Sequence, residues 1–330
     1  MISNTEYKNK KVLITGGLGF IGSNLAIRLA GLGAEVTLID SMISQYGGNK
    51  FNIIDIKDKV HINYSDVRDG YSMNHLIRDK DYLFNLAGQV SHIDSMTDPL
   101  TDLEINSKSQ LSILEACRKS NPGIRIIFTS TRQVYGIPQQ LPINESHPLN
   151  PADINGINKI SGERYHLLYS RVYGVRCVVL RLTNTYGPRQ LVKHDKQGFM
   201  GWFVRQIVRG EKINIFGDGK QLRDLNFVDD VVDALLAVGI NEKAYGEVFN
   251  LGSDKPVSLK ELVELMIGIN GKGAYEFVPF PEEKKKIDIG SVYADFKKIK
   301  KAIGWSPKVS LEEGLKETFE FYRKYGEHYW

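Results

Sequence analysis

The stretch Lys11-Val-Leu-Ile-Thr15-Gly16-Gly17-Leu18-Gly19-Phe20-Ile21-Gly22 decides the fold of this chain of 330 residues. A short apolar run ends at glycines, as a buried parallel strand does, and helical periodicity follows over 21–30. In a strand–turn–helix of this kind, Gly16 permits a tight turn, Gly19 lets the backbone approach a pyrophosphate, and Gly22 allows close packing of the helix on the sheet. The stretch therefore predicts a dinucleotide-binding site.

The cofactor is predicted from the start of this helix and from the end of the next strand. Phe20 and Ile21 open the helix, whose N-terminus presents free N–H groups and a positive dipole to phosphates. Asp40 ends the second apolar run, where a carboxylate accepts hydrogen bonds from ribose hydroxyls and repels a 2′-phosphate. No basic residue follows in Ser41-Met42-Ile43. The pattern favours NAD over NADP, with Asp40 as a simple turn residue the alternative.

Apolar runs and helical patterns alternate along the first half of the chain. The alternation predicts βαβ crossovers and an α/β fold with a Rossmann-type, doubly wound parallel sheet. Helices are expected over 99–120 and 159–173. The expected strands are Lys11–Thr15, Glu35–Asp40, Val60–Asn63, Tyr82–Leu86, Arg125–Thr129 and Arg176–Arg181.

The pattern changes after residue 182. Loops rich in Gly, Pro and Arg, such as Tyr186–Arg189 and Phe216–Gly219, interrupt short helices there. We expect an NAD-binding domain over 1–182, with segments near 225–252 returning to it, and a smaller, mainly substrate-binding lobe over 183–330.

Composition excludes several classes of protein. The formal net charge of +4 is modest, and it predicts neither nucleic-acid nor membrane partners. Residues 1–11 lack the apolar core of a signal peptide, and no apolar run approaches the length of a membrane span. Cys117 and Cys177 stand in apolar contexts without metal-ligand spacing, so we expect core thiols, no metal site and a cytoplasmic protein.

Several motifs together resemble the nucleotide-sugar epimerase/dehydratase family of extended short-chain dehydrogenases/reductases. They include T-G-G-x-G-F-I-G, D-V-R-D, N-L-A-G-Q, S-T-R-Q-V-Y-G, R-L-T-N-T-Y-G-P-R and the terminal G-W-S-P-K-V-S-L-E-E-G-L. The resemblance runs from Lys11 to about Phe321. It implies adenine contacts from Asp66 and Val67 and cofactor packing by the Leu86-Ala87-Gly88 segment, which follow the third and fourth strands.

The resemblance also implies a catalytic Ser/Thr, Tyr and Lys, and one of the three is missing. Thr131 and Lys159 match the family positions, and Lys159 also serves the cofactor, but Asn155 stands where the tyrosine belongs. In the family a hydride leaves a sugar carbon for NAD⁺ while a tyrosinate takes the hydroxyl proton. A carboxamide cannot accept that proton near neutral pH.

Three explanations for the missing base remain open. Lys159 itself acts as the base, because burial beside a cationic ring depresses a lysine pKa. Alternatively, His92 substitutes, since its segment resembles the loop that lines the family's sugar pocket, although a lone loop histidine is more often structural. In the third, the protein binds NAD and a sugar nucleotide without efficient turnover. Classical dehydration is disfavoured, because Arg132 and Gln133 replace the acid/base pair of the dehydratases.

Substrate contacts are also implied by the resemblance. Asn184 and Arg223 match residues that contact the nucleotide diphosphate, with a surface pair between Arg223 and Asp224 as the alternative. Asp288 matches a further element of the family, in which Lys285 stands for the usual arginine. Arg189 and Phe216 are expected to flank the base and phosphates.

The resemblance predicts an NAD-dependent epimerase that acts on a nucleoside-diphosphate sugar by transient oxidation. Position 4 of the sugar is favoured, and position 2 stays open because several segments resemble the CDP-paratose 2-epimerase branch. A dehydrogenase or keto-sugar reductase is the alternative enzyme, and a non-catalytic NAD-binding protein is the alternative of another class. Two long helices match those of a dimer interface, so a homodimer is expected.

Overall fold

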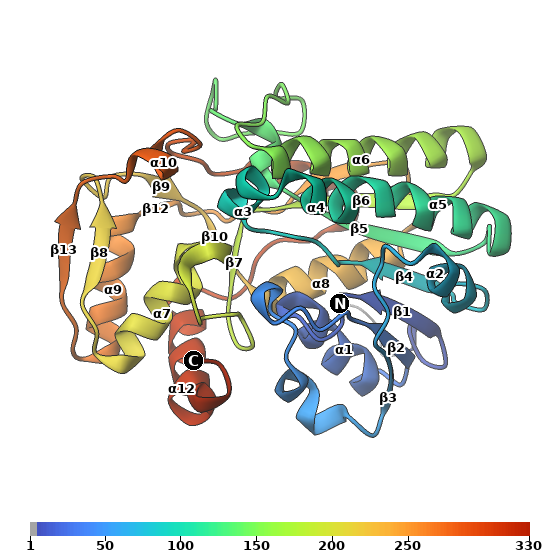
Figure 1. Cartoon of the computed structure of the whole chain (residues 1–330), viewed down its shortest axis with the longest axis horizontal. Helices are drawn as coiled ribbons and strands as arrows, with labels where there is room; N and C mark the ends of the chain where they lie inside the picture. The colour runs from blue at the N-terminus through green and yellow to red at the C-terminus, as the bar shows by residue number, and fades with distance from the viewer. Residues whose placement is uncertain (1–4) are drawn as a thin grey trace.

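The computed structural model describes residues 5–330, and its centre is a seven-stranded sheet in which every neighbouring pair is parallel (Figure 1). Helices cover both faces, so the predicted α/β fold with a doubly wound sheet is confirmed. In spatial order the strands are β11 (Val248–Asn250), β6 (Arg176–Leu182), β5 (Arg125–Thr131), β4 (Tyr82–Asn85), β1 (Lys11–Thr15), β2 (Glu35–Ile39) and β3 (Val60–Asn63).

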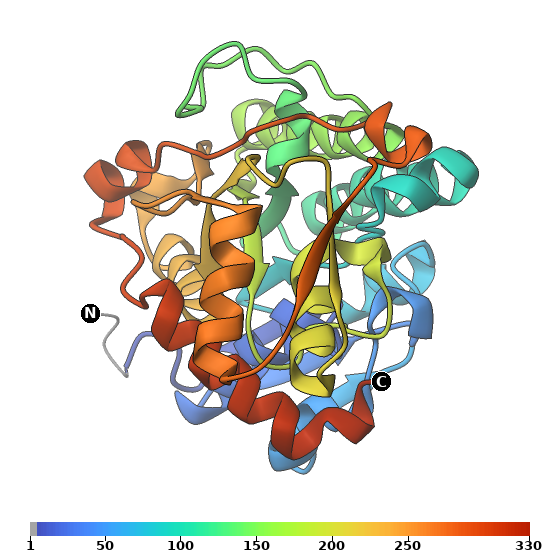
Figure 2. The same ribbon diagram turned by 90° about the vertical axis from the view of Figure 1, so that its left-hand side faces the viewer.

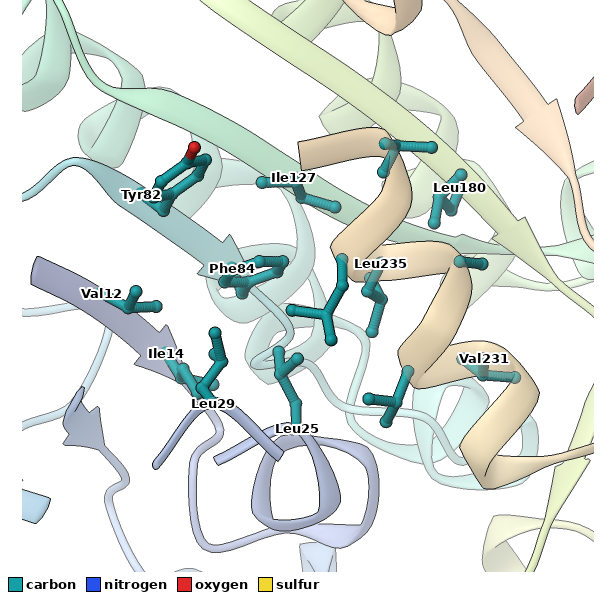
Figure 3. Packing of buried hydrophobic residues seen from close by; sticks show 14 of the residues in the cluster. Val12, Ile14, Leu25, Leu29, Tyr82, Phe84, Ile127, Leu180, Val231 and Leu235 are labelled. Carbon is teal, nitrogen blue, oxygen red and sulfur yellow. The ribbon is translucent and has the colours of Figure 1, made fainter. Parts of the chain in front are cut away.

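Side chains on alternate faces of the strands anchor the two helical layers. Val12 and Ile14 of β1 pack with Phe84 of β4 against Leu25 of α1 and Leu235 of α8 (Figure 3). Leu13, which lies between Val12 and Ile14, points to the helical layer on the opposite face of the sheet, as the two-residue period of a strand requires. Full burial of each such side chain contributes about 1.5–3 kcal/mol. The continuous apolar run of β1 therefore reflects a strand that is buried on both faces.

The helices of the main domain differ from the predicted ones at two points. The helix predicted over 99–120 contains a π-helical turn. The helix predicted over 159–173 begins five residues earlier than expected, and Asp153 caps its first turn by accepting the N–H of Gly156. The helices are α1 (Phe20–Gly31), α2 (Gly70–Leu76), α3 (His92–Thr97), α4 (Pro99–Leu103), the π-turn η3 (Glu104–Lys108), α5 (Ser109–Ser120), α6 (Ile154–Tyr173), α8 (Val228–Gly239) and α11 (Lys297–Ile303).

The smaller lobe lies beside the carboxyl edge of the sheet, at the left of Figure 1 and towards the viewer in Figure 2. It has an apolar core of its own, to which α7, α9 and α12 contribute. Its elements are β7 (Asn184–Tyr186), α7 (Phe199–Arg209), β8 (Ile213–Phe216), β9 (Leu222–Arg223), β10 (Leu225–Phe227), β12 (Val257–Ser258), α9 (Leu259–Asn270), β13 (Tyr275–Val278), α10 (Glu282–Lys285) and α12 (Leu311–Tyr325).

The chain crosses between the two parts more than once. Of the segment 225–252, α8 packs on the main sheet and β11 joins its edge, whereas β10 pairs with β7 outside that sheet. Short 3₁₀ turns connect the larger elements. They are η1 (Ser44–Tyr46), η2 (Lys50–Ile56), η4 (Arg132–Tyr135), η5 (Asp195–Gln197), η6 (Glu242–Ala244) and η7 (Gly326–His328).

The strand order places a ligand crevice at a definite point. The chain moves outward from β1 in one direction through β2 and β3, and in the other through β4, β5 and β6. Ligands of doubly wound sheets bind where this order reverses, outside the carboxyl ends of the strands. Over residues 5–330 no helix is both long and apolar enough to span a bilayer. Cys117 and Cys177 are buried and unpaired.

Candidate active site

One pocket runs along the carboxyl ends of six strands of the main sheet, from β3 to β6. It brings together every residue predicted to bind the cofactor and all four predicted catalytic residues. Of the residues predicted to bind the substrate, only Asn184 lines this pocket. The lining includes Gly16, Gly19, Phe20, Ile21, Gly22, Asp40, Asp66, Val67, Leu86, Ala87, Gly88, His92, Thr131, Asn155, Lys159 and Asn184.

The glycine turn fits a dinucleotide. A Cβ at Gly22 would lie 2.1 Å from the carbonyl oxygen of Gly16, so any other residue would push α1 away from β1. Gly16 has a φ of 68°, which favours glycine, and a Cβ there would lie only 3.1 Å from the Cα of Ala87. Gly19 is the N-cap of α1, and no side chain caps that helix. Its first N–H groups therefore face the pocket, where they suit a pyrophosphate.

Asp40 is the residue predicted to bind the ribose, and it lines the pocket just after β2. Its carboxylate accepts the N–H groups of Leu18 and Met42, at 3.0 and 2.9 Å. Burial raises the pKa of Asp40, and these two hydrogen bonds oppose that rise. Lys159 and Arg132 are the lysine and arginine side chains among the described residues lining the pocket, and both follow the fifth strand. The Asp40 end thus has no lysine or arginine to bind a 2′-phosphate, as the preference for NAD requires.

Two predicted cofactor segments have partners of their own. Asp66 pairs with Arg68, at 2.8 Å between Oδ2 and Nη2, and this interaction lowers the pKa of Asp66. The N–H groups of Leu86 and Ala87 donate to the Thr15 hydroxyl. Gly88 lines the pocket for a different reason, which is the space that Lys159 needs behind it.

Lys159 lies buried behind Gly88. A Cβ on Gly88 would come within 3.0 Å of Lys159 Nζ, so the glycine makes room for the lysine. Nζ donates to the carbonyl of Thr129 at 3.3 Å and lies 5.1 Å from the centre of the Phe128 ring. Burial lowers the pKa of Lys159 to about 8, although the carboxylates of Asp102 and Glu163 oppose the shift. Lys159 therefore loses much of its charge just above neutral pH.

Asn155 is tied to acceptors behind the pocket wall. Its Nδ2 donates to the carbonyl of Gln89 at 2.7 Å and to Asp102 Oδ2 at 3.1 Å. Asn158 donates to the other oxygen of Asp102 at 2.8 Å. A carbonyl and a carboxylate accept only, so the amide nitrogen must face them and Asn155 Oδ1 is left for a ligand. Asn155 thus offers the pocket a hydrogen-bond acceptor that does not titrate.

His92 forms a pair with a buried carboxylate. His92 Nδ1 lies 3.0 Å from Oδ2 of Asp153, whose side chain is fully buried while that of His92 is 31% exposed. Asp153 also accepts the N–H of Gly156 and the side-chain amide of Gln133, each at 2.7 Å. Burial acts to raise the pKa of Asp153, but His92 and these two donors bring it below its usual range. His92 Nδ1 therefore lies at ion-pair distance from a charged carboxylate, although the two groups are not aligned for a hydrogen bond, and Nε2 of His92 is left for the pocket.

Thr131 is the fourth of the predicted catalytic residues that line the pocket. It ends β5, and its hydroxyl oxygen accepts the N–H of Gln133 at 3.2 Å. The hydroxyl hydrogen stays available to an oxygen in the pocket. The next residue, Arg132, also lines the pocket and opens the turn η4.

The predicted substrate residues divide into two groups. Asn184 lines the pocket and donates to the carbonyl of Asp224 at 3.0 Å. Arg223 and Asp288 lie beyond the lining and face each other, with 3.7 Å between Nη2 and Oδ1. Arg223 therefore pairs with Asp288 and not, as the alternative supposed, with Asp224, whose carboxylate accepts the N–H of Ala294.

Arg189 and Phe216 lie away from the pocket lining. The Arg189 guanidinium donates to the side chain of Asn24 at 2.9 Å and to the carbonyl of Asn52 at 3.1 Å, which joins its loop to the NAD-binding domain. Phe216 packs beside Phe280, with ring centres 5.5 Å apart. Arg189 is thus already engaged within the protein.

The profile of the NAD dependent epimerase/dehydratase family matches residues 12–252. The chain belongs to this family. Because the family is NAD-dependent and the glycine turn and Asp40 fit that cofactor, NAD is the cofactor of this epimerase/dehydratase. When bound, NAD accepts a hydride from a substrate carbon and returns it.

Several relatives that match nearly the whole chain are named as nucleotide-sugar epimerases. A putative UDP-glucose 4-epimerase of Methanocaldococcus jannaschii is 33% identical over 93% of this chain and 96% of its own length. The CDP-paratose 2-epimerase of Salmonella typhi is 32% identical, over 94% and 98%. A UDP-glucose 4-epimerase structure from Thermotoga maritima, with UDP-glucose, has a TM-score of 0.86 and 34% identity, over 96% and 99%. The protein is therefore an enzyme of the nucleotide-sugar epimerase type.

Sequence reasoning missed two carboxylates of this site. Asp102 holds Asn155 and Asn158, and Asp153 holds His92. Asp153 had a readable signal, because an Asp just before a helical pattern is a typical N-cap. Asp102 had none, since the single chain gives no hint that its helix buries it.

Proposed function

We propose that this enzyme epimerises a nucleoside-diphosphate sugar by transient oxidation of a ring carbon, with C4 favoured and C2 as the alternative. The single observation that carries the proposal is the pair of His92 and Asp153 in the same pocket as Lys159 and the glycine turn. It supplies a proton acceptor to a site that lacks the family tyrosine. The names of the relatives, which act at position 4 or position 2, support both carbons as candidates.

The proposed reaction is balanced by the groups present. As the O–H and C–H bonds of the sugar break and a C=O bond forms, His92 Nε2 would take the proton, and NAD, held by the glycine turn and Asp40, would supply the acceptor of the hydride. The fixed carboxylate of Asp153 stabilises the imidazolium that results. Thr131 donates its hydroxyl hydrogen to the reacting oxygen, and Asn155 Oδ1 accepts from a neighbouring sugar hydroxyl. Return of the hydride to the opposite face of the ketone inverts the carbon.

Lys159 is better suited to charge stabilisation than to proton transfer. Its side chain is buried, and its ammonium donates to a backbone carbonyl. With a pKa of about 8, it is mostly protonated at neutral pH, where the positive charge favours a developing alkoxide. If Lys159 were instead the base, hydride transfer would rise as the pH passes about 8.

The sugar nucleotide is proposed to extend from this centre towards the lobe. Asn184 lines the pocket and is the direct contact that we propose for the diphosphate. Arg223, Asp288 and Phe216 lie behind it, so we propose that they engage the nucleotide only when the lobe moves towards the sheet. Arg189 is proposed to position the loop that carries it.

A panel of UDP-, GDP-, CDP- and dTDP-sugars tests the function. We expect the NAD-loaded protein to convert one of them to an isomer of unchanged mass without net accumulation of reduced nicotinamide. Mass spectrometry with chromatography of the sugars and the absorbance of reduced nicotinamide provide the two readouts. Accumulating reduced cofactor would instead make the enzyme a dehydrogenase, and binding without chemistry would make it a non-catalytic sensor.

We also propose a homodimer through the outer faces of α4, α5 and α6, which lie side by side over one face of the sheet (Figure 1). Large apolar side chains on these helices stand in water, a feature typical of interaction surfaces. They include Leu100, Leu103 and Leu111 on α4 and α5, and Ile157 and Val172 on α6, with exposed fractions of 38–71%.

We expect the double variant Leu100→Glu/Ile157→Glu to sediment as a monomer, because two charges would replace apolar contacts in each protomer. The wild type and a Phe277→Glu control, which changes an exposed apolar side chain on the distant strand β13, should both sediment as dimers. Analytical ultracentrifugation gives the masses. A monomeric wild type at the same concentrations would refute the interface.

A further inference from the structure

Arg132 is a cation without a partner in the pocket. It follows Thr131 directly, and its side chain lines the same wall. Within residues 5–330, no group forms a hydrogen bond or an ion pair with its guanidinium, although Nε is buried. The side chain as a whole is only partly buried, so the rest of the guanidinium stays accessible from the pocket, where it can pair with an anionic group of a ligand.

The charges around Arg132 do not supply that partner. Burial lowers the pKa of Arg132 to about 10, and the like charge of Arg223 acts in the same direction. Asp224, Asp153 and Asp288 oppose the shift, but none lies within ion-pair distance of Arg132. The guanidinium is therefore still protonated at neutral pH, and the like charge of Arg223, which lies beyond the pocket lining, repels it. An oxyanion from a ligand would relieve both conditions.

The position of Arg132 indicates which part of the ligand that oxyanion belongs to. Its backbone neighbour Thr131 is the residue that faces the reacting hydroxyl in the proposed reaction. Arg223 and Asp224 act on Arg132 more strongly than Asp153 does, so the guanidinium lies between the lobe residues and the wall that carries His92. Its adjacency to Thr131 is what favours the sugar end of the pocket, whereas Asn184 carries the proposed diphosphate contact.

We propose that Arg132 binds a carboxylate on the sugar ring, and that the preferred substrates are nucleoside-diphosphate uronic acids. The planar guanidinium pairs with a carboxylate through two parallel hydrogen bonds, which a neutral hydroxymethyl group cannot replace. A neutral sugar would displace water from the cation without pairing with it, and such sites discriminate against the analogue that lacks the partner. This inference rests on the proposed function of the pocket.

Binding of UDP-glucuronic acid, UDP-glucose and UDP to the NAD-loaded protein tests the inference. All three probes contain the same uridine diphosphate, so a preference of the protein for one nucleotide base does not affect the ratios of their affinities. We expect the wild type to bind UDP-glucuronic acid about 10- to 100-fold more tightly than UDP-glucose, in line with a charge-assisted hydrogen-bonded pair. In Arg132→Gln that ratio should fall to about one, and Arg132→Lys should retain part of it.

Controls separate this inference from its alternatives. Arg78→Gln changes an exposed arginine that follows α2 and lies outside the pocket lining, and it should leave all three affinities unchanged. A wild type without preference for the acidic sugar would overturn the inference. So would an equal loss of affinity for all three probes in Arg132→Gln, since that outcome assigns Arg132 to the diphosphate. Epimerisation of UDP-glucose by the wild type as fast as that of UDP-glucuronic acid would overturn this inference alone and leave the proposed function standing.

Discussion

His92→Gln is expected to slow hydride transfer to bound NAD by about 10²–10⁴-fold, the usual contribution of a general base. Glutamine keeps a polar side chain beside Asp153 but does not titrate, so it cannot take the hydroxyl proton. The affinity for NAD should be unchanged, because the glycine turn and Asp40 lie at the other end of the pocket. Single-turnover absorbance of reduced nicotinamide, with the sugar nucleotide found in the panel, measures the rate.

Two companion variants sharpen this result. His61→Gln changes an exposed histidine on β3 and should leave the rate unchanged. Asp153→Asn keeps a residue that caps α6 but removes the charge that stabilises the imidazolium, so an intermediate loss is expected. If His92→Gln retained the full rate, and that rate rose with pH near 8, the base would be Lys159.

Glu163→Gln is expected to lower the free energy of unfolding by about 3–5 kcal/mol, because it leaves a buried arginine without its counter-ion. Both carboxylate oxygens of Glu163 accept from Arg181, at 2.9 and 2.6 Å, and both side chains are almost fully buried. Arg181 also donates to the hydroxyl of Tyr135, which in turn donates to Asn250. One network thus joins α6, β6, η4 and β11.

Urea denaturation of the NAD-free protein measures this loss. Glu312→Gln is the matched control, since it removes an exposed i,i+4 pair with Lys316 that contributes about 0.3–0.5 kcal/mol. Glu163 also follows Lys159 by one helical turn and opposes the fall of its pKa, so Glu163→Gln should move the lysine pKa further below about 8. Equal destabilisation by the two variants would contradict the structural role of the buried pair.

The parts of the site that could be predicted are those that local sequence determines. The glycine turn follows β1 directly, and Asp40 and Asp66 follow β2 and β3, so strand order alone brings them to one edge. That rule holds for any parallel sheet, because its strands all end on the same side. The cofactor half of the pocket was therefore predictable from the spacing of strands and glycines.

The proton-transfer half was not predictable in the same way. Asn155 meets Asp102 and Gln89 across separations of 53 and 66 residues, which no periodicity encodes. The orientation of His92 likewise depends on Asp153, which belongs to the cap of another helix. Buried polar partners are fixed by tertiary packing, and a single chain shows only their residue types.

The contacts of the residues that were assigned by resemblance to the family could not be predicted from the sequence either. Arg189 has its hydrogen-bonding capacity directed at Asn24 and Asn52, and Arg223 pairs with Asp288. An arginine in a loop serves equally well for phosphate binding or for joining two segments, and the sequence does not distinguish the two uses. The contacts of these arginines required the structure.

The central claim is that the proton acceptor lies at His92 and not at residue 155, and chemical rescue tests it most directly. His92→Ala removes the imidazole from a partly open position in the pocket, and free imidazole in the assay can occupy the space. The measurement is the single-turnover rate of hydride transfer at rising imidazole concentration. We predict a rate that increases with imidazole in His92→Ala and stays constant in the wild type. No recovery, in a variant that still binds NAD and the sugar nucleotide, would contradict the claim.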